Sequence, residues 1–230
     1  MTARVGVVVF PGSNCEHDVI EALGLLGGDG SLLWHGDRSV GAVDAVVLPG
    51  GFAHGDYLRP GAIARFSPIM QAVGAFAADG GPVVGICNGF QVLTEAGLLP
   101  GALQKNRGLS FLCTTVDLRV DSRRSVLTEG VEADRILRIP INHFEGNYTC
   151  DEATLRRLEG DDRVILRYVD NPNGSMHDVA GICNEGGNVV GLMPHPERAS
   201  DPLLGSSDGL VLLQSLLDAA GRGAARSLAG

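Results

Sequence analysis

The sequence lacks the patterns that would assign its five cysteines to a disulfide framework or to a zinc site. They stand at positions 15, 87, 113, 150 and 183, an odd number without a C-x-x-C pair. In a reducing compartment, each free thiol is then expected to have a role either in packing or in catalysis. Cysteine is among the residues most often buried, so packing is the default interpretation for any single one of them.

The sequence also lacks a dense run of lysine or arginine, and its formal net charge is −9. We therefore do not expect nucleic acid as a partner. No apolar stretch reaches the about 18 residues typical of a membrane-spanning helix, and the N-terminal M-T-A-R shows none of the zones of a signal peptide. We expect a soluble, cytoplasmic protein with no membrane partner.

Nucleotide-binding motifs are missing as well, since neither a P-loop G-x-x-x-x-G-K-S/T nor a Rossmann G-x-G-x-x-G is present. The chain of 230 residues, 44% of them hydrophobic, has the size and composition of one globular α/β domain. We expect a single domain over residues 1–230, frayed only in the tail from Gly221, with no metal and no cofactor in this chain.

The first hundred residues alternate short apolar runs with helical patterns. This alternation predicts a parallel sheet that is covered by helices on both faces. The expected strands are 5–10, 32–34, 44–48 and 82–86, and the expected helices are one that carries Val19 to Leu26, one at 69–78 and one at 90–96.

From about residue 108 onward, apolar runs follow one another with few helices between them, which predicts antiparallel pairing. The predicted fold class is therefore α/β, with a central, mostly parallel sheet, flanking helices and an additional antiparallel section. The expected elements are strands at 114–120, 136–140, 164–169 and 189–193, and a closing helix with Leu210, Leu213 and Leu217 after the possible caps Ser206 and Ser207.

Cys87 lies in the stretch G-I-C-N-G-F-Q, between a predicted buried strand and a predicted helix. The pattern G-x-C-x-G is the cysteine counterpart of the nucleophile elbow, in which glycines allow a sharp strand-to-helix turn. The C-terminal edge of an α/β sheet is the usual ligand site, and a helix N-terminus favours a thiolate. By this pattern alone, a nucleophile and an ordinary core thiol stay equally good interpretations of Cys87.

A base for this thiol is offered by M-P-H-P-E-R at 193–198, just after another predicted strand. His195 and Glu197 point to the same side of an extended segment, and the flanking prolines favour that extension. A carboxylate can orient an imidazole in this way, as in a Cys-His-acid triad. Taken alone, His-Pro-Glu is more often a surface turn; together with an elbow cysteine, the triad is the better interpretation.

Donors for an oxyanion can come from the glycine-rich loop L-P-G-G-F at 48–52 and from the start of the helix after Cys87. We expect the backbone N–H groups of Gly51 and Asn88 in this role. The alternative is that the loop glycines serve backbone geometry only. His54, in the polar loop that follows, is a second candidate base, but nothing in the sequence orients it as Glu197 would orient His195.

These three motifs together resemble the class I glutamine amidotransferases of the triad type. Finer motifs are similar to one family among them, the glutaminase subunits of phosphoribosylformylglycinamidine synthases. They are F-P-G-S-N-C-E at 10–16, G-G-F-A-H-G-D-Y-L-R-P-G-A-I-A at 50–64, E-G-N-Y at 145–148, R-Y-V-D-N-P-N-G-S at 167–175 and G-L-M-P-H-P-E-R at 191–198. The resemblance spans about residues 4 to 217 and implies a flavodoxin-like amidotransferase fold.

The resemblance implies that Cys87 attacks the side-chain amide of glutamine and that His195, oriented by Glu197, protonates the departing ammonia and then activates water. It places Gly51 and Asn88 around the oxyanion. It also places three residues near the bound glutamine, namely Phe52, Asp56 and Gln91.

The resemblance also implies partners. A glutaminase without an ATP site must release its ammonia or hand it on. In the family, a large synthetase subunit receives the ammonia and uses ATP and Mg²⁺ to convert formylglycinamide ribonucleotide, often with a small accessory subunit.

Two positions depart from the family pattern. The family commonly has A-H-G-E-G where this chain has N-H-F-E-G at 142–146, and R-A-G-A where it has R-P-G-A at 59–62. We expect Phe144 to reshape the wall of the glutamine pocket or the contact with a partner subunit. Neither Phe144 nor Pro60 alters the proposed triad.

Two rival interpretations stay open. A different cysteine hydrolase, or a DJ-1-like protein, can carry an elbow cysteine on the same kind of sheet, but such proteins generally lack the paired P-H-P-E. A catalytically silent regulatory module would keep the elbow for structure only. The presence of all three triad residues argues against the silent module.

Overall fold

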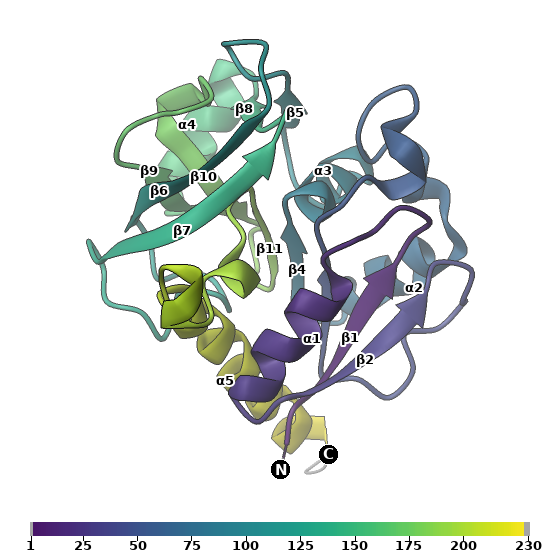
Figure 1. Cartoon of the computed structure of the whole chain (residues 1–230). Helices are drawn as coiled ribbons and strands as arrows, with labels where there is room; N and C mark the ends of the chain where they lie inside the picture. Colours follow the sequence, from purple (N-terminus) through teal and green to yellow (C-terminus); the bar gives the residue numbers. More distant parts are fainter. Residues whose placement is uncertain (1, 228–230) are drawn as a thin grey trace.

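The computed structural model describes residues 2–227 of the chain, and it is built around one mixed sheet (Figure 1). Within these residues, the main sheet has nine strands in the order β2-β1-β3-β4-β11-β10-β9-β6-β7. The first five of these strands are parallel, and the remaining four are antiparallel to their neighbours. The predicted fold class is confirmed, and the antiparallel section continues the same sheet.

The parallel strands are β1 (Arg4–Val9), β2 (Asp29–Trp34), β3 (Ala45–Leu48), β4 (Val83–Ile86) and β11 (Val189–Leu192). The antiparallel strands are β6 (Leu112–Val120), β7 (Ile136–His143), β9 (Val164–Tyr168) and β10 (Val179–Cys183). A separate pair is formed by β5 (Ala102–Gln104) and β8 (Asn147–Thr149). Every residue of β3, β4 and β11 is buried, as continuous apolar runs predict for strands covered on both faces.

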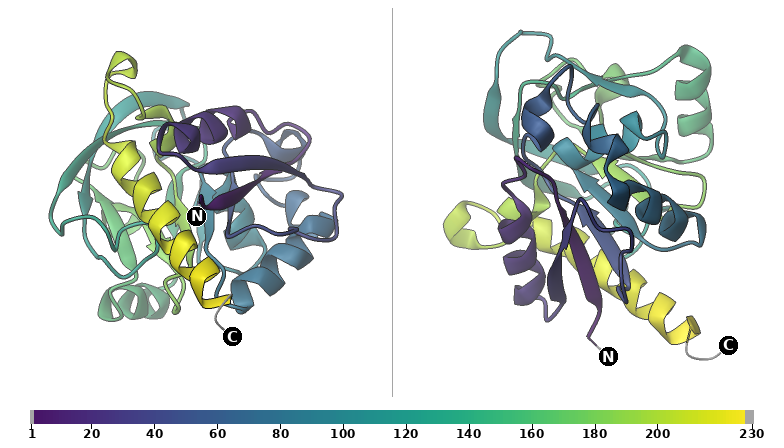
Figure 2. Two further views of the ribbon diagram at one scale, coloured as in Figure 1. Left: turned by 90° about the horizontal axis from the view of Figure 1, so that it is seen from below. Right: turned by 90° about the vertical axis from the view of Figure 1, so that its right-hand side faces the viewer.

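The helices are α1 (Glu16–Leu25), α2 (Pro68–Ala78), α3 (Asn88–Glu95), α4 (Glu152–Gly160) and α5 (Gly209–Ser227). The chain runs from β1 through α1 to β2, which lies beside one edge of β1. β3 then lies beside the other edge of β1, and β4 lies next to β3. Because such crossovers are right-handed, α1 lies on one face of the sheet and α2 on the opposite face. α5 packs beside α1, and Figure 2 shows it from two further sides along the lower end of the sheet.

The strand order reverses at β1 and β3, and this reversal marks the usual ligand site of an open α/β sheet. The loops after β1, β3, β4 and β11 all leave the sheet at its C-terminal edge, at the upper end of the view in Figure 1. Within residues 2–227, no helix combines the length and the apolar character needed to cross a bilayer.

Several element predictions need correction. α4, β10 and the short strands β5 and β8 are not among the elements predicted from the sequence. β7 ends at His143 instead of the predicted Pro140. The closing helix continues through Ser227, past Gly221, where we expected the chain to fray. Residues 228–230 of that tail lie outside the described residues. The Ser206 hydroxyl accepts a hydrogen bond from the Asp208 N–H (3.0 Å), just before the helix begins.

Candidate active site

Cys87 occupies the turn between β4 and α3. Its backbone has φ 50° and ψ −104°, a conformation that costs a residue with a side chain about 1–3 kcal/mol. The glycines on both sides make the turn possible, because a Cβ on Gly85 would lie 2.6 Å from the Gly89 backbone and one on Gly89 would collide with the Leu48 carbonyl. The turn sets the thiol at the C-terminal edge of the sheet, in the geometry of a nucleophile elbow.

The Cys87 thiol is 5% exposed and lies at a cleft of about 360 Å³. The structure brings Gly51 and all three predicted glutamine contacts to this cleft. The Cys87 Sγ is 3.7 Å from the backbone carbonyl oxygen of Asn142 near the end of β7. Besides Cys87, the lining residues are Gly51, Phe52, Asp56, Leu58, Arg59, Pro60, Gln91, Lys105, Asn142, His143, Phe144 and Glu145.

His195 and Glu197 follow β11 and form a buried pair. The His195 Nδ1 and the Glu197 Oε1 are 2.6 Å apart, and their side chains are 2% and 0% exposed. The His195 backbone N–H donates to the carbonyl oxygen of Pro140 on β7 (2.9 Å), which ties the segment to the sheet. Within the described part of the chain, the His195 Nε2 has no hydrogen-bond partner. The ring therefore has one nitrogen oriented by the carboxylate and one free for proton transfer.

Burial and neighbouring charges shift the pKa of His195 in opposite directions. Burial on its own lowers the pKa of His195, but the charges of Glu197 and Cys87 outweigh burial, so this pKa lies well above its ordinary value. A protonated His195 imidazole near the Cys87 sulfur is thus favoured in this pocket. Such a pair supplies a nucleophile and an acid in one place.

The side chain of Asn88 connects the residues at the bottom of the cleft. Its Oδ1 accepts from the Ala53 N–H (3.0 Å), and its Nδ2 donates to Gln91 Oε1 (2.8 Å) and Asp56 Oδ1 (3.2 Å). Gln91 in turn donates to the carbonyl oxygen of Glu145. The Asn88 N–H opens α3, where amides have no partner within the helix, so its backbone is free for the predicted oxyanion role.

The cleft carries charges of both signs. Burial raises the pKa of Asp56 to about 6, against the hydrogen bond from Asn88, and the charge of Glu145 adds to the rise. Lys105, the only lysine in the sequence, contributes a positive charge to the same cleft. Arg59 also lines the cleft, but its guanidinium is paired with Glu95 at 2.6 Å. The sequence analysis assigned no role to Lys105 or Glu145.

His143, one residue before the Phe144 departure, is also at the cleft. It is 3% exposed and its Nδ1 is 3.1 Å from Asn106 Oδ1. Burial lowers the pKa of His143 to about 4, and the neighbouring His195 contributes to this shift. His143 is therefore uncharged at neutral pH and does not compete with His195 for a proton.

Phe144 and Pro60, the two departures from the family pattern, both line the cleft. The Lys105 Nζ lies 6.0 Å from the centroid of the Phe144 ring, at the outer limit of a cation–π contact. Phe144 therefore forms part of the wall of the Cys87 cleft, where we expected it to affect the pocket.

The second candidate base, His54, lies elsewhere. Its ring packs edge-on against His35, with 5.3 Å between centroids, and near Phe10. Burial lowers the pKa of His54, and His35 adds to this effect. His54 is not among the residues that line the Cys87 cleft, so its geometry favours an aromatic cluster over a role as base.

A second cysteine, Cys15, lies beside the buried pair. Its Sγ, one nitrogen of His195 and one carboxylate oxygen of Glu197 all lie within 4.8 Å of one another. The sequence analysis missed this neighbour. Its position just after the first predicted strand was the available signal, since parallel strands end at one edge of a sheet.

Cysteine, histidine and glutamate are donors that suit Zn²⁺. Here the His195 Nδ1 is already engaged by Glu197, and the Nη2 of Arg198 donates to the Cys15 sulfur at 3.1 Å. A guanidinium so close to the sulfur repels a second cation. The cluster therefore favours a hydrogen-bond network over a metal centre.

Comparison with known proteins agrees with this geometry. The CobB/CobQ-like glutamine amidotransferase domain matches residues 2–207. The phosphoribosylformylglycinamidine synthase subunit PurQ of Rubrobacter xylanophilus is 59% identical over 214 residues, covering 93% of this chain and 97% of the relative. That of Koribacter versatilis is 51% identical over 226 residues, covering 94% and 98%.

Among solved structures, the fold is similar to a chain in the structure of PurLQS from Thermotoga maritima. The TM-score is 0.88 at 43% sequence identity, and the match covers 95% of this chain and 99% of that chain. The similarity thus extends over nearly the whole chain.

Proposed function

Because the chain belongs to the family of CobB/CobQ-like glutamine amidotransferases, and among them to the PurQ subunits, we propose that it is the glutaminase of a phosphoribosylformylglycinamidine synthase. It hydrolyses glutamine to glutamate and ammonia and passes the ammonia to a synthetase subunit. The observation that carries this proposal is that β4, which leads to the Cys87 turn, pairs with β11, which leads to the buried His195–Glu197 pair, and that Cys87 lies close enough to His195 to affect its pKa.

In the first half of the reaction, the Cys87 thiolate attacks the side-chain amide carbon of glutamine. The carbonyl oxygen becomes an oxyanion, which the N–H groups of Gly51 and Asn88 stabilise. The C–N bond then breaks, and His195 gives its proton to the leaving nitrogen, so ammonia departs and a glutamyl thioester remains. Glu197 keeps the imidazole ring in the orientation that this transfer needs.

In the second half, water replaces ammonia. His195, now neutral, accepts a proton from the water as its oxygen attacks the thioester carbon. The C–S bond breaks, glutamate is released, and the Cys87 thiolate and the His195 imidazolium are restored. The same two oxyanion donors serve both halves.

The charges of the cleft suit a free α-amino acid. Glutamine carries an ammonium and a carboxylate at its α-carbon, and the cleft offers the carboxylates of Asp56 and Glu145 and the ammonium of Lys105. Phe52 packs against the carbon chain, and Gln91 contributes its amide. These roles agree with the predicted glutamine contacts and add Glu145 and Lys105 to them.

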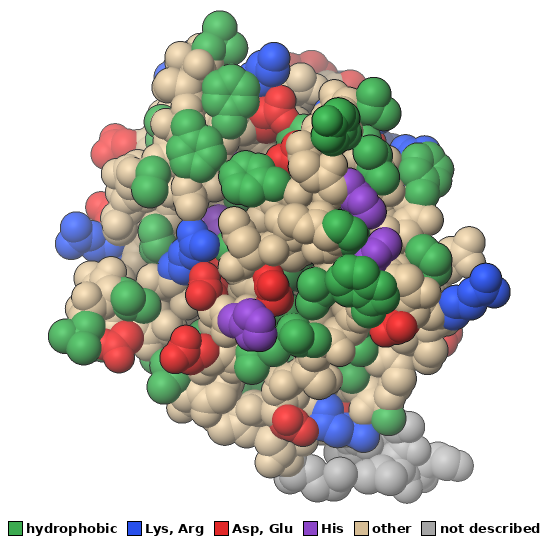
Figure 3. Space-filling model, turned by 45° about the vertical axis from the view of Figure 1, so that its right-hand side comes forward, with side chains coloured by type: hydrophobic (Ala, Val, Ile, Leu, Met, Phe, Trp, Pro, Cys, Tyr) green, Lys and Arg blue, Asp and Glu red, His purple; other side chains and the backbone are tan. Residues whose placement is uncertain are grey.

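The surface around the cleft suits a partner subunit. Phe52, Leu58 and Phe144 line the cleft and are 49%, 89% and 36% exposed. Hydrophobic side chains also gather over the upper part of the face in Figure 3, the end at which the parallel strands terminate. Exposed apolar groups that surround a cleft are typical of an interface.

We assign this surface to a PurL-type synthetase subunit, the kind of partner named in the Thermotoga maritima structure. That subunit uses ATP and Mg²⁺ for the ligation step, and a small PurS-type subunit completes the assembly in the cytoplasm. This chain itself needs no cofactor or metal for the hydrolysis. From its acidic net charge we expect neither nucleic acid nor a membrane among its partners.

A Cys87→Ala variant tests the proposal in the assembled synthase. We expect glutamine-dependent synthesis to be abolished and synthesis from added ammonia to remain, because the synthetase subunit keeps its own site. Loss of both activities in a correctly assembled complex would place Cys87 in a structural role. Undetectable glutamate release by the wild-type complex would support a different cysteine hydrolase or a silent regulatory module.

A further inference from the structure

Three segments of the chain meet behind the imidazole ring of His195. The loop between β1 and α1 carries Cys15, the loop after β3 carries Gly50, and the segment after β11 carries His195 and Arg198. The backbone N–H groups of Asn14 and Cys15 both point at the Gly50 carbonyl oxygen, at 3.4 and 3.3 Å. The loop with the predicted oxyanion donor is thereby attached to the loop that holds Cys15.

The Cys15 thiol is held from both sides. Its sulfur accepts a hydrogen bond from Arg198 Nη2 and donates to Asn14 Oδ1, each at 3.1 Å. Arg198 is itself fixed by a bond from its Nε to Asp18 Oδ2 (3.2 Å). The thiol is 1% exposed, so solvent does not compete for these contacts. A buried side chain with this many partners has one defined position.

The thiol and the imidazole share the space above Gly50. A Cβ on Gly50 would lie 2.7 Å from the His195 Cε1 and 3.1 Å from the Cys15 sulfur. The absence of a side chain at position 50 therefore allows the sulfur and the ring to pack over the same spot. Any movement of the sulfur changes the space available to the ring.

We propose that Cys15 is a positioning residue, whose sulfur, anchored by Arg198, holds the His195 ring in line between Glu197 and Cys87. It touches no substrate and forms no bond in the reaction. A thiol fits this place because a carboxylate here would compete with Glu197 for the proton on Nδ1. The inference rests on the proposed function, since it concerns the geometry of that same triad.

Kinetics of Cys15→Ala in the assembled synthase test this inference. We expect kcat for glutamine hydrolysis to fall about 10- to 100-fold, as when a catalytic group loses its support, while KM for glutamine stays within about twofold. Cys15→Ser, whose hydroxyl can keep both hydrogen bonds, should lose less activity than Cys15→Ala. The matched control is Cys183→Ala, because Cys183 is equally buried on β10 and lies outside the cleft.

A second measurement separates positioning from general destabilisation. We expect Cys15→Ala to slow the labelling of Cys87 by a glutamine-mimicking alkylating agent, while ammonia-dependent synthesis by the same complex is unchanged. If the alanine variant does not fold, the serine variant is compared with Cys183→Ala in the same two assays.

The two possible failures are distinguishable. An inactive wild-type complex would overturn the proposed function itself. An active wild type together with Cys15 variants that match the Cys183→Ala control in kcat and in labelling rate would overturn the inference alone. Loss of activity through KM only would also overturn it, because a displaced imidazole lowers kcat.

Discussion

Two histidine–glutamate pairs of nearly equal length occur within residues 2–227. The Nδ1–Oε1 distance is 2.6 Å for His195 and Glu197 and 2.8 Å for His177 and Glu159. The side chains of the first pair are 2% and 0% exposed, and those of the second are 58% and 33% exposed. Distance alone therefore does not separate the pair at the proposed active site from the surface pair. Burial does.

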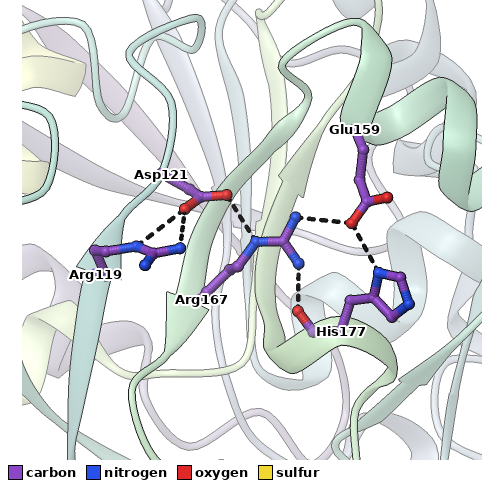
Figure 4. A network of polar contacts seen from close by, with 5 residues as sticks. All are labelled: Arg119, Asp121, Glu159, Arg167 and His177. Atoms are coloured by element: carbon purple, nitrogen blue, oxygen red, sulfur yellow. Dashed lines mark hydrogen bonds and ion pairs between the residues drawn. The ribbon is translucent and has the colours of Figure 1, made fainter.

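The exposed pair is one part of a larger network, shown in Figure 4. Arg167 donates to Glu159 Oε1 (3.0 Å) and to Asp121 Oδ2 (2.7 Å), and Arg119 also bonds to Asp121. The network joins β6, β9 and α4 in the antiparallel section. The hydrogen bond from His177 is the main cause that holds the pKa of Glu159 below its usual value.

The comparison shows what the surroundings contribute. Solvent and Arg167 share the charge of the exposed pair, so its effect is on stability and is small. The Glu197 side chain is 0% exposed, and among residues 2–227 its one ion pair is with His195, so its charge acts on His195. The same two residue types thus stabilise a surface in one place and prepare proton transfer in the other.

The largest expected difference comes from removing each carboxylate in turn. Glu197→Gln should lower kcat for glutamine hydrolysis about 10³-fold or more, because an amide neither orients the imidazole correctly nor offsets its charge. Glu159→Gln should change kcat by less than about twofold, since surface substitutions have small effects. Steady-state glutamate release by the assembled synthase measures both. Equal effects of the two substitutions on kcat would contradict the conclusion that burial distinguishes the two pairs.

A smaller effect concerns the acid limit of the enzyme. We expect KM for glutamine to rise about tenfold as pH falls from 7 to 5, because Asp56, with its pKa raised to about 6, becomes protonated and no longer pairs with the substrate ammonium. His195 should stay protonated throughout this window, since its pKa lies well above its ordinary value.

Asp56→Asn provides the control for this pH dependence. Its KM should be high and nearly constant between pH 5 and 7. A fall in kcat over the same window, with KM unchanged, would instead assign the acid limit to the His195–Glu197 pair.

The smallest effect is expected for the stability of the exposed network. At low salt and neutral pH, Glu159→Gln should lower the free energy of unfolding by less than about 1 kcal/mol, and high salt should remove most of the difference. Because the folded-state pKa of Glu159 is lowered, its contribution is present above the unfolded-state pKa and is lost as pH falls through the folded value.

Urea unfolding of wild type and Glu159→Gln at neutral and acidic pH checks this sign. The two proteins should converge at acidic pH. A difference that grows on acidification would mean that the carboxylate stabilises the fold through its neutral form.

The parallel section of the fold was predictable because its strands are continuous apolar runs separated by helices. The antiparallel section was harder, for local reasons. α4 buries little apolar surface, with Leu155 and Leu158 on an otherwise polar helix, although Asp151 at its N-cap was a readable signal. β10 is a short run that contains Gly181, and such runs do not distinguish a strand from a loop.

The end of β7 was missed for a different reason. Proline normally interrupts a strand, but β7 is the last strand of the sheet, and Pro140 is tolerated on such an edge. The position of a strand within the sheet is a tertiary property, so the run itself did not reveal it.

Cys87 and the His195–Glu197 pair were predictable because both lie at ends of predicted strands. The proposal that Phe52, Asp56 and Gln91 contact glutamine came only from the family resemblance. The link between Cys15 and Arg198 was not predictable, because these residues are 183 positions apart and meet only in the folded chain.

The outer edge of β7 has a consequence beyond catalysis. On this edge strand, the backbone groups of alternate residues point away from β6. The Arg138 N–H donates to Asp208, and the Pro140 carbonyl oxygen accepts from the His195 N–H. Pro140 itself has no N–H to leave unpaired. An unpaired strand edge is a template for intermolecular pairing and aggregation. The backbone bond that holds His195 therefore also covers part of this edge. We expect a variant that releases the His195 segment to self-associate as well as to lose activity.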